Sequence, residues 1–185
     1  MTIAPEPIWR ADRQQRMFRD LLQAVSFPGR IQDLSPQLQG APAYRGVLAT
    51  LVDGAVFLSD PHRLLDDTDW PLLQARAAPP DAADYILCDG GRTVNFSPRL
   101  GDLPNPERGA TLILLVECIG AGDQTVAVSG PGIDDQMVVH LAGLDRSWLT
   151  RRQGWVLNFP LGVDFILADS ARVVAFPRTT RIGVC

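Results

Sequence analysis

The chain has 185 residues, of which 46% are hydrophobic and 21% charged, and its formal net charge is −4. This size and composition favour one globular domain, and the acidic balance argues against a general nucleic-acid-binding protein. The sequence shows no signal peptide and no apolar run long enough to span a bilayer, so we expect a cytoplasmic protein that does not enter membranes.

The N-terminal half predicts an arm followed by helices and short strands. Residues 1–7 contain two prolines and no periodic pattern, which predicts a flexible arm, and residues 8–185 form the predicted single domain. A helix starting at residue 8 has Met17, Leu21, Leu22 and Val25 on one apolar stripe and ends at the breaker 26–29 (SFPG). The next predicted elements are a strand over 30–34, a loop over 35–43, a helix over 44–52, a strand over 55–58 and a helix over 69–77.

The C-terminal half predicts mainly strands. The expected elements are a strand over 84–88, a long surface loop over 95–108, a strand over 110–119, a turn over 120–123, a strand over 124–129, a helix within 143–157, and a terminal strand pair over 165–168 and 173–176. The strands on either side of the turn 120–123 are predicted to form a hairpin. Short buried strands interleaved with helices favour a layered α/β fold with a mixed sheet flanked by helices.

Several kinds of chemistry lack the residues that they need. The chain contains no lysine, since all 17 of its Lys and Arg positions are arginine, so it cannot form a lysine Schiff base or a P-loop. The three cysteines are scattered, which argues against a disulfide framework and an iron–sulfur cluster. His62 and His140 lie far apart in the sequence, and solvated surface histidines are the better interpretation. We therefore expect no cofactor and no metal ion.

Arg178, Thr179 and Thr180 directly follow the predicted strand over 173–176. An arginine offers a planar fork of donors and the two hydroxyls add further donors, so this segment is a candidate anion-binding site. The alternative interpretation is a strand end with a solvated arginine and two threonines that favour extended backbone. The position of Arg178 just beyond a strand predicts that Arg178→Ala impairs function and leaves the fold largely intact.

A second group of candidates follows the predicted strand over 124–129. Ser129, Gly130 and Gly132 belong to a small-residue loop in which backbone N–H groups can approach an anion closely, although Pro131 removes one donor. Arg99 in the loop over 95–108 adds a further charge. The alternative interpretation is an ordinary turn. No acid, base or nucleophile is evident beside these residues, so the set suits binding of a phosphate or phosphonate group, and no catalytic residue can be assigned.

Four separated segments resemble one protein family. Residues 159–168 (FPLGVDFILA) followed by 177–180 (PRTT) near the C-terminus, residues 18–29 (FRDLLQAVSFPG), residues 109–114 (GATLIL) and residues 129–133 (SGPGI) match its motifs in the same order. On these segments the chain resembles the H subunit of the carbon–phosphorus lyase system, the PhnH family. None of the segments is a catalytic signature, so the resemblance depends on their combination.

The resemblance implies a fold, partners and a function. The family is similar in fold to pyridoxal-phosphate-dependent transferases, and the missing lysine means that this likeness would be architectural only, without the cofactor. Family members form homodimers and belong to a complex with the G, I and J subunits. With an associated ATP-binding-cassette-type L protein, this complex transfers alkylphosphonate onto the ribose of ATP and displaces adenine. The resemblance thus implies an essential non-catalytic subunit, with ATP or alkylphosphonate as possible ligands of a shared pocket. The alternatives are a stand-alone phosphate-ester or nucleotide-handling enzyme, or a binding module for phosphorylated metabolites.

Overall fold

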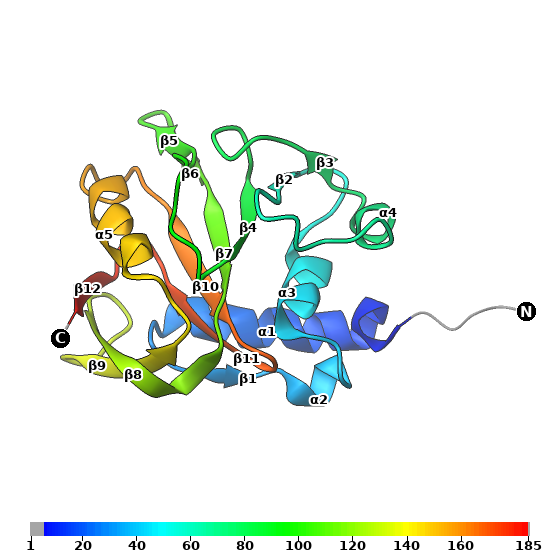
Figure 1. Ribbon diagram of the computed structural model, residues 1–185, viewed down its shortest axis with the longest axis horizontal. Helices are drawn as coiled ribbons and strands as arrows, with labels where there is room; N and C mark the ends of the chain where they lie inside the picture. Colours follow the sequence, from blue (N-terminus) through cyan, green and yellow to red (C-terminus); the bar gives the residue numbers. More distant parts are fainter. Residues whose placement is uncertain (1–5, 185) are drawn as a thin grey trace, which may run out of the picture.

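A seven-stranded mixed sheet forms the centre of the computed structural model, which describes residues 6–184 (Figure 1). Its strand order is β1-β11-β10-β7-β4-β2-β3. The strands are β1 (Gln32–Asp33), β2 (Phe57–Ser59), β3 (Arg76–Ala77), β4 (Tyr85–Asp89), β7 (Thr111–Leu115), β10 (Asp164–Ala168) and β11 (Arg172–Phe176). Neighbours from β3 to β10 run parallel, whereas β11 is antiparallel to both β10 and β1. The predicted mixed sheet and terminal strand pair are therefore confirmed.

Both faces of this sheet are buried. Leu112 and Leu114 of β7 belong to one hydrophobic cluster and Ile113, between them, belongs to the other, and all three are fully buried. Successive side chains of a strand point to opposite faces, so a strand covered on both sides has to be apolar at every position. This explains why the central strands are recognisable in the sequence as continuous apolar runs.

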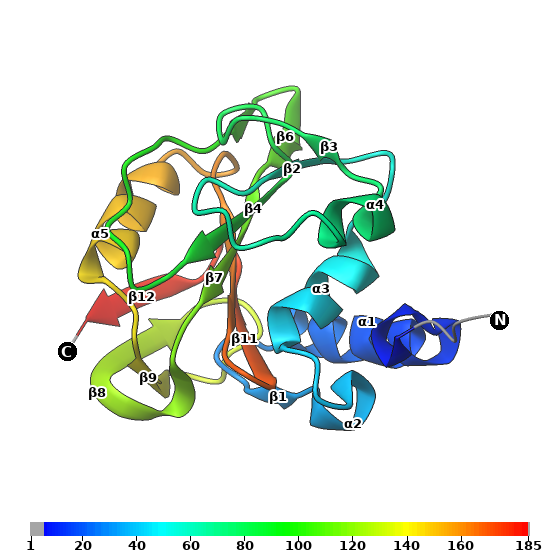
Figure 2. The ribbon, with the colours of Figure 1, turned by 45° about the vertical axis from the view of Figure 1, so that its right-hand side comes forward.

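Helices cover one face of the sheet. They are η1 (Pro7–Trp9), α1 (Ala11–Ser26), α2 (Ser35–Leu38) and α3 (Ala43–Leu51), with α4 (Asp69–Leu73) beside β2 and β3 (Figures 1 and 2). Met17, Leu21 and Ala24 form the buried side of α1. Leu22 and Val25, which the predicted stripe included, remain 52% and 44% exposed. The predicted stripe was therefore only partly correct, because the i, i+4, i+7 spacing that starts at Met17 runs through Leu21 to Ala24 and leaves out Leu22 and Val25.

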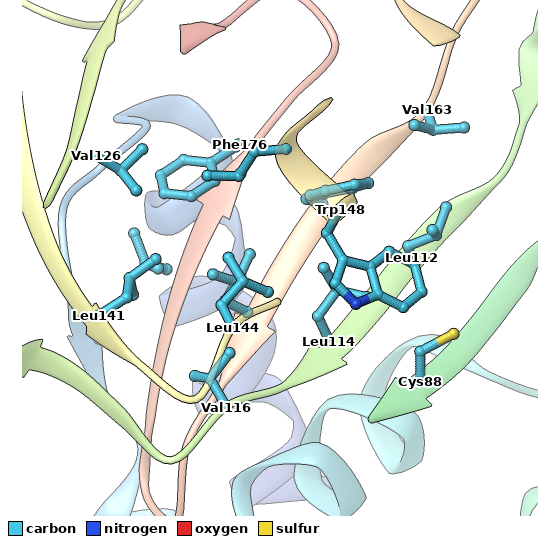
Figure 3. Close-up of a cluster of buried hydrophobic side chains, with 14 of the residues drawn as sticks. Cys88, Leu112, Leu114, Val116, Val126, Leu141, Leu144, Trp148, Val163 and Phe176 are labelled. Carbon is cyan, nitrogen blue, oxygen red and sulfur yellow. The ribbon is translucent and has the colours of Figure 1, made fainter. Parts of the chain in front are cut away.

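The other face is covered by a helix and a smaller sheet. Helix α5 (Arg146–Trp155) lies beside the antiparallel strands β12 (Arg181–Val184), β8 (Cys118–Ser129) and β9 (Met137–Ala142), on the side opposite α1–α3 in Figure 2. Figure 3 shows Trp148 of α5 among Leu112, Leu114 and Phe176. The indole N–H of Trp148 donates to the Arg92 carbonyl at 2.8 Å, so this large side chain is fixed at both its apolar and its polar end.

Several sequence-based expectations about the elements were wrong. The strands around residues 120–123 do not form a hairpin: β7 ends at Leu115 and pairs with β4 and β10, and β8 continues through the glycines with a register shift between Ile119 and Gln124. Gly120 and Gly122 have φ angles of 92° and 132°, which permit an irregular strand as well as a turn. The loop over 95–108 contains the hairpin β5 (Leu100–Asp102) and β6 (Asn105–Gly109).

Three smaller differences concern segment ends. The loop over 35–43 contains α2, and the helix over 69–77 stops at Leu73 before β3. Of the predicted arm over 1–7, residues 1–5 lie outside the described residues, and Pro7 already begins η1. No helix within residues 6–184 combines the length and apolarity needed to cross a membrane.

Candidate functional site

Most of the predicted anion-binding residues gather where the chain passes from β11 to β12. Thr179 and Thr180 lie in this link, and Arg181 at the start of β12 pairs with Ser129 at the end of β8. Gly130 follows with a φ of 129°, and a Cβ atom added there would lie 2.9 Å from the Thr179 carbonyl oxygen. The structure therefore brings Ser129 and Gly130 beside the threonines, and Gly130 permits the close approach of the two backbones.

Gly132 and Arg99 lie apart from this group. Gly132 has a φ of 83° and a Cβ atom added there would overlap the Ser26 carbonyl oxygen, so it packs against the end of α1. The Arg99 guanidinium forms an ion pair with Asp84 and donates to the Arg108 carbonyl at 2.5 Å. A cavity lies beside Arg178, Thr179 and Thr180, and its lining includes neither Gly132 nor Arg99, nor does it include Ser129 or Gly130.

Arg178 is held by the chain itself. Its Nη2 lies 2.6 Å from Oδ2 of Asp164, its Nη1 donates to the Pro106 carbonyl at 2.6 Å, and its backbone N–H donates to Asp164 at 2.7 Å. A longer contact of 3.3 Å joins Nη1 to the Pro160 carbonyl. The side chain is 14% exposed and its charge is balanced by a carboxylate. Arg178 thus fixes the link to the start of β10, and few of its donors remain for a ligand.

A cavity of about 570 Å³ opens between α5, the segment after it, and β12. Its lining residues are Pro131, Arg152, Gln153, Val156, Leu157, Phe159, Arg178, Thr179, Thr180, Arg181 and Ile182. Three of these are arginines and none is acidic. In a chain of net charge −4, the cavity therefore concentrates positive charge.

Arg152 is the residue of this cavity that the sequence reasoning missed. It is only 2% exposed, and its Nη1 and Nη2 donate to the carbonyls of Thr180 at 3.1 Å and Pro177 at 2.5 Å. Its guanidinium also lies 5.6 Å from the ring centroid of Phe165, within cation–π range. Burial lowers the pKa of Arg152 to about 10, against the opposing effect of Asp164, so the side chain remains charged at neutral pH.

The sequence does contain a signal for the burial of Arg152. It follows Trp148 by four residues and precedes Trp155 by three, so all three side chains lie on the same side of a helix. Trp148, Arg152 and Trp155 are indeed buried in α5. An arginine at a core position of an amphipathic helix indicates either internal acceptors or a ligand, because arginine is almost never fully buried without a partner.

The cavity lies at the amino end of the parallel strands. Asp164, which binds Arg178, is the first residue of β10, and the strands β4, β7 and β10 all begin at this edge. Open α/β sheets usually bind ligands at the opposite, carboxyl edge. At that edge, His62 accepts a hydrogen bond from the Asp89 backbone N–H at 2.9 Å, and burial, together with Arg92, lowers the pKa of His62.

The lining of the cavity contains cations, hydroxyls and apolar side chains, but no carboxylate, histidine or cysteine. Within residues 6–184, no three acidic, histidine or cysteine side chains are grouped so that they could hold a metal ion. The cations and hydroxyls of the lining therefore suit recognition of an anion. The lining offers no side chain that titrates near neutral pH, which general acid–base catalysis would need.

Comparison with known proteins places the chain in a family. The family model described as bacterial phosphonate metabolism protein (PhnH) matches residues 6–183. The chain belongs to the PhnH family. This confirms the resemblance that the four sequence segments indicated.

Two curated relatives match nearly the whole chain. A protein of Stutzerimonas stutzeri named putative C-P lyase subunit protein HtxG is 42% identical over 177 residues, which is 96% of this chain and 89% of the relative. A protein of Rhizobium meliloti (strain 1021) named alpha-D-ribose 1-methylphosphonate 5-triphosphate synthase subunit PhnH is 29% identical over 193 residues, covering 96% and 92% of the two chains.

Proposed function

We propose that this chain is an essential, non-catalytic subunit of a bacterial carbon–phosphorus lyase core complex. The observation that carries the proposal is the full-length similarity to a relative named as a C-P lyase subunit, at 42% identity. The second relative is named as a subunit of a synthase whose product joins methylphosphonate to a ribose triphosphate. The proposed reaction of the complex is accordingly the transfer of alkylphosphonate onto the ribose of ATP, with adenine displaced.

The composition of the cavity supports a non-catalytic role. Its lining offers positive charge and hydroxyl groups without a side chain that titrates near neutral pH. We propose that the chain forms a homodimer and assembles with the G, I and J subunits in the cytoplasm, where ATP is available. In this assembly Thr179, Thr180, Ser129 and Gly130 would help to form an anion-binding pocket for ATP or alkylphosphonate.

The proposed scaffold is similar to that of pyridoxal-phosphate-dependent transferases. The layered α/β architecture with a largely parallel sheet supports this likeness. Because the chain has no lysine, it has no residue to form the internal aldimine that such enzymes use. The proposed likeness is therefore one of architecture.

Co-expression with candidate G, I and J subunits tests the assembly. We expect size exclusion with light scattering to show one stoichiometric complex that contains this chain. The matched control is the same G, I and J set expressed without it, which we expect to release less adenine from ATP and an alkylphosphonate. A chain that elutes alone as a dimer, beside an active complex of the other three, would contradict the proposal.

The purified chain provides the complementary test for a stand-alone enzyme. On its own it should release no adenine from ATP and should not hydrolyse a phosphate ester such as 4-nitrophenyl phosphate. Turnover of either substrate by the isolated chain would instead support the alternative of an independent phosphate-ester or nucleotide-handling enzyme.

A further inference from the structure

The arginine-lined cavity holds positive charge that the described residues leave unbalanced. Of its three arginines, Arg178 forms an ion pair with Asp164. Arg152 and Arg181 have no carboxylate of residues 6–184 within ion-pair distance. Arg152 is nevertheless buried, and a buried charge without a counter-ion is costly unless other groups or a ligand compensate for it.

Two buried polar atoms at this cavity also have no partner within residues 6–184. They are Nε of Arg152 and the hydroxyl oxygen of Thr180. Thr180 is only 2% exposed, and its carbonyl, not its hydroxyl, accepts the bond from Arg152. Buried polar groups are nearly always hydrogen-bonded in folded proteins, so these two donors indicate an acceptor that the chain itself does not supply.

The cavity lining also includes apolar side chains. Leu157 and Phe159 are 78% and 65% exposed, and Val156 and Ile182 line the cavity as well. A volume of about 570 Å³ exceeds what a bare oxyanion needs and lies within the range of small-molecule sites. Exposed apolar side chains beside a group of arginines indicate a ligand with one anionic and one apolar part.

We propose that this cavity binds a phosphate or phosphonate dianion that carries an apolar substituent. Arg152 and Arg181 balance its two charges, the Thr180 hydroxyl donates a hydrogen bond to it, and Leu157 and Phe159 contact the substituent. The inference deepens the proposed function, since it names the ligand class and adds Arg152 to the predicted threonines. It rests on the geometry of the isolated chain and is tested on that chain.

Calorimetric titration of the full chain with phenylphosphonate and with phenyl phosphate tests the ligand class. We expect a Kd below about 1 mM for at least one of them, and binding of inorganic phosphate that is about tenfold weaker or more. A preference between the two probes identifies a phosphonate or a phosphate ester as the source of the dianion. Absence of heat from both probes at a concentration of about 10 mM would overturn the proposal.

Thr180→Val and Arg181→Gln separate binding from folding. Thr180→Val removes a hydroxyl that has no partner, so thermal stability should stay unchanged or rise while phenylphosphonate binds about fivefold more weakly. Arg181→Gln removes an exposed charge and should weaken binding about tenfold. The matched control is Arg151→Gln, which changes an exposed arginine on α5 that does not line the cavity. If both cavity variants bind like the control, the site is wrongly assigned.

The binding and assembly experiments fail independently. A chain that binds the probe but does not co-elute with G, I and J would retain this site and reject the proposed complex. A chain that co-elutes but binds neither probe would reject the site alone. Arg152→Gln separates binding from folding less cleanly, because the carbonyls of Thr180 and Pro177 lose their donors when the guanidinium is removed.

Discussion

Replacing Arg178 by alanine should destabilise the fold, in contrast to the expectation from sequence alone. The substitution leaves the Asp164 carboxylate without its cationic partner and removes the donor to the Pro106 carbonyl. Breaking a buried ion pair from one side costs about 3–5 kcal/mol, and a hydrogen bond to a charged group contributes about 1.5–3 kcal/mol. Because the Asp164 side chain is 30% exposed, water can replace part of the lost contact. We therefore expect a loss of about 2–3 kcal/mol in the free energy of unfolding.

Urea unfolding followed by circular dichroism measures this loss directly, and the Tm should fall by about 5–10 °C for a chain of this length. Arg178→Lys keeps the charge but not the planar fork, so its stability should lie between those of the wild type and the alanine variant. Arg151→Ala is the matched control on an exposed arginine. An Arg178→Ala variant as stable as Arg151→Ala would refute the structural role assigned to Arg178.

Three further substitutions test other parts of the structure. Burial raises the pKa of Asp169, but hydrogen bonds from three backbone N–H groups and the neighbouring arginine outweigh it and lower the pKa overall. Asp169→Asn should therefore lower the free energy of unfolding by about 2–4 kcal/mol at pH 7. This difference from the wild type, measured by urea unfolding, should shrink as the pH falls below about 4, where the wild-type carboxylate becomes protonated. A difference that stays constant with pH would contradict the role of the charged carboxylate. Gly130→Ala should lower the Tm, since its new Cβ atom would meet the Thr179 carbonyl at 2.9 Å and its φ is 129°, whereas an unchanged Tm would show that the loop relaxes freely. Trp148→Ala should cost about 3–5 kcal/mol in the same assay, and a loss below about 1 kcal/mol would be inconsistent with the packing of its core.

Part of the predicted site can be named from the sequence because some of its residues are local in the chain. Thr179 and Thr180 follow β11 directly, and the pattern of a buried strand followed by hydroxyls is visible without the fold. Their proximity to Ser129 depends on the pairing of β12 with β8, which no local pattern specifies. Arg99 resembles them only in residue type, and its partner Asp84 holds it away from the cavity.

The sequence by itself determined the protein family and the layered α/β class of the fold. Four short motifs in a fixed order indicated the PhnH family, and continuous apolar runs such as that of β7 indicated strands buried on both faces, since every second side chain points to each face. The absence of lysine excludes a lysine Schiff base, such as the internal aldimine of pyridoxal phosphate enzymes, whatever the fold.

Only the tertiary structure decided which strands pair and which charges are neutralised. β7 lies between β4 and β10, although β8 follows it in the chain, and Arg178 donates to Pro106, 72 residues away. Hydrophobic periodicity reports which side of an element is buried but not what covers it. Arg152 and Arg178 differ in their partners: Asp164 pairs with the Arg178 guanidinium, whereas the Arg152 guanidinium donates to the carbonyls of Thr180 and Pro177 and lies over the Phe165 ring.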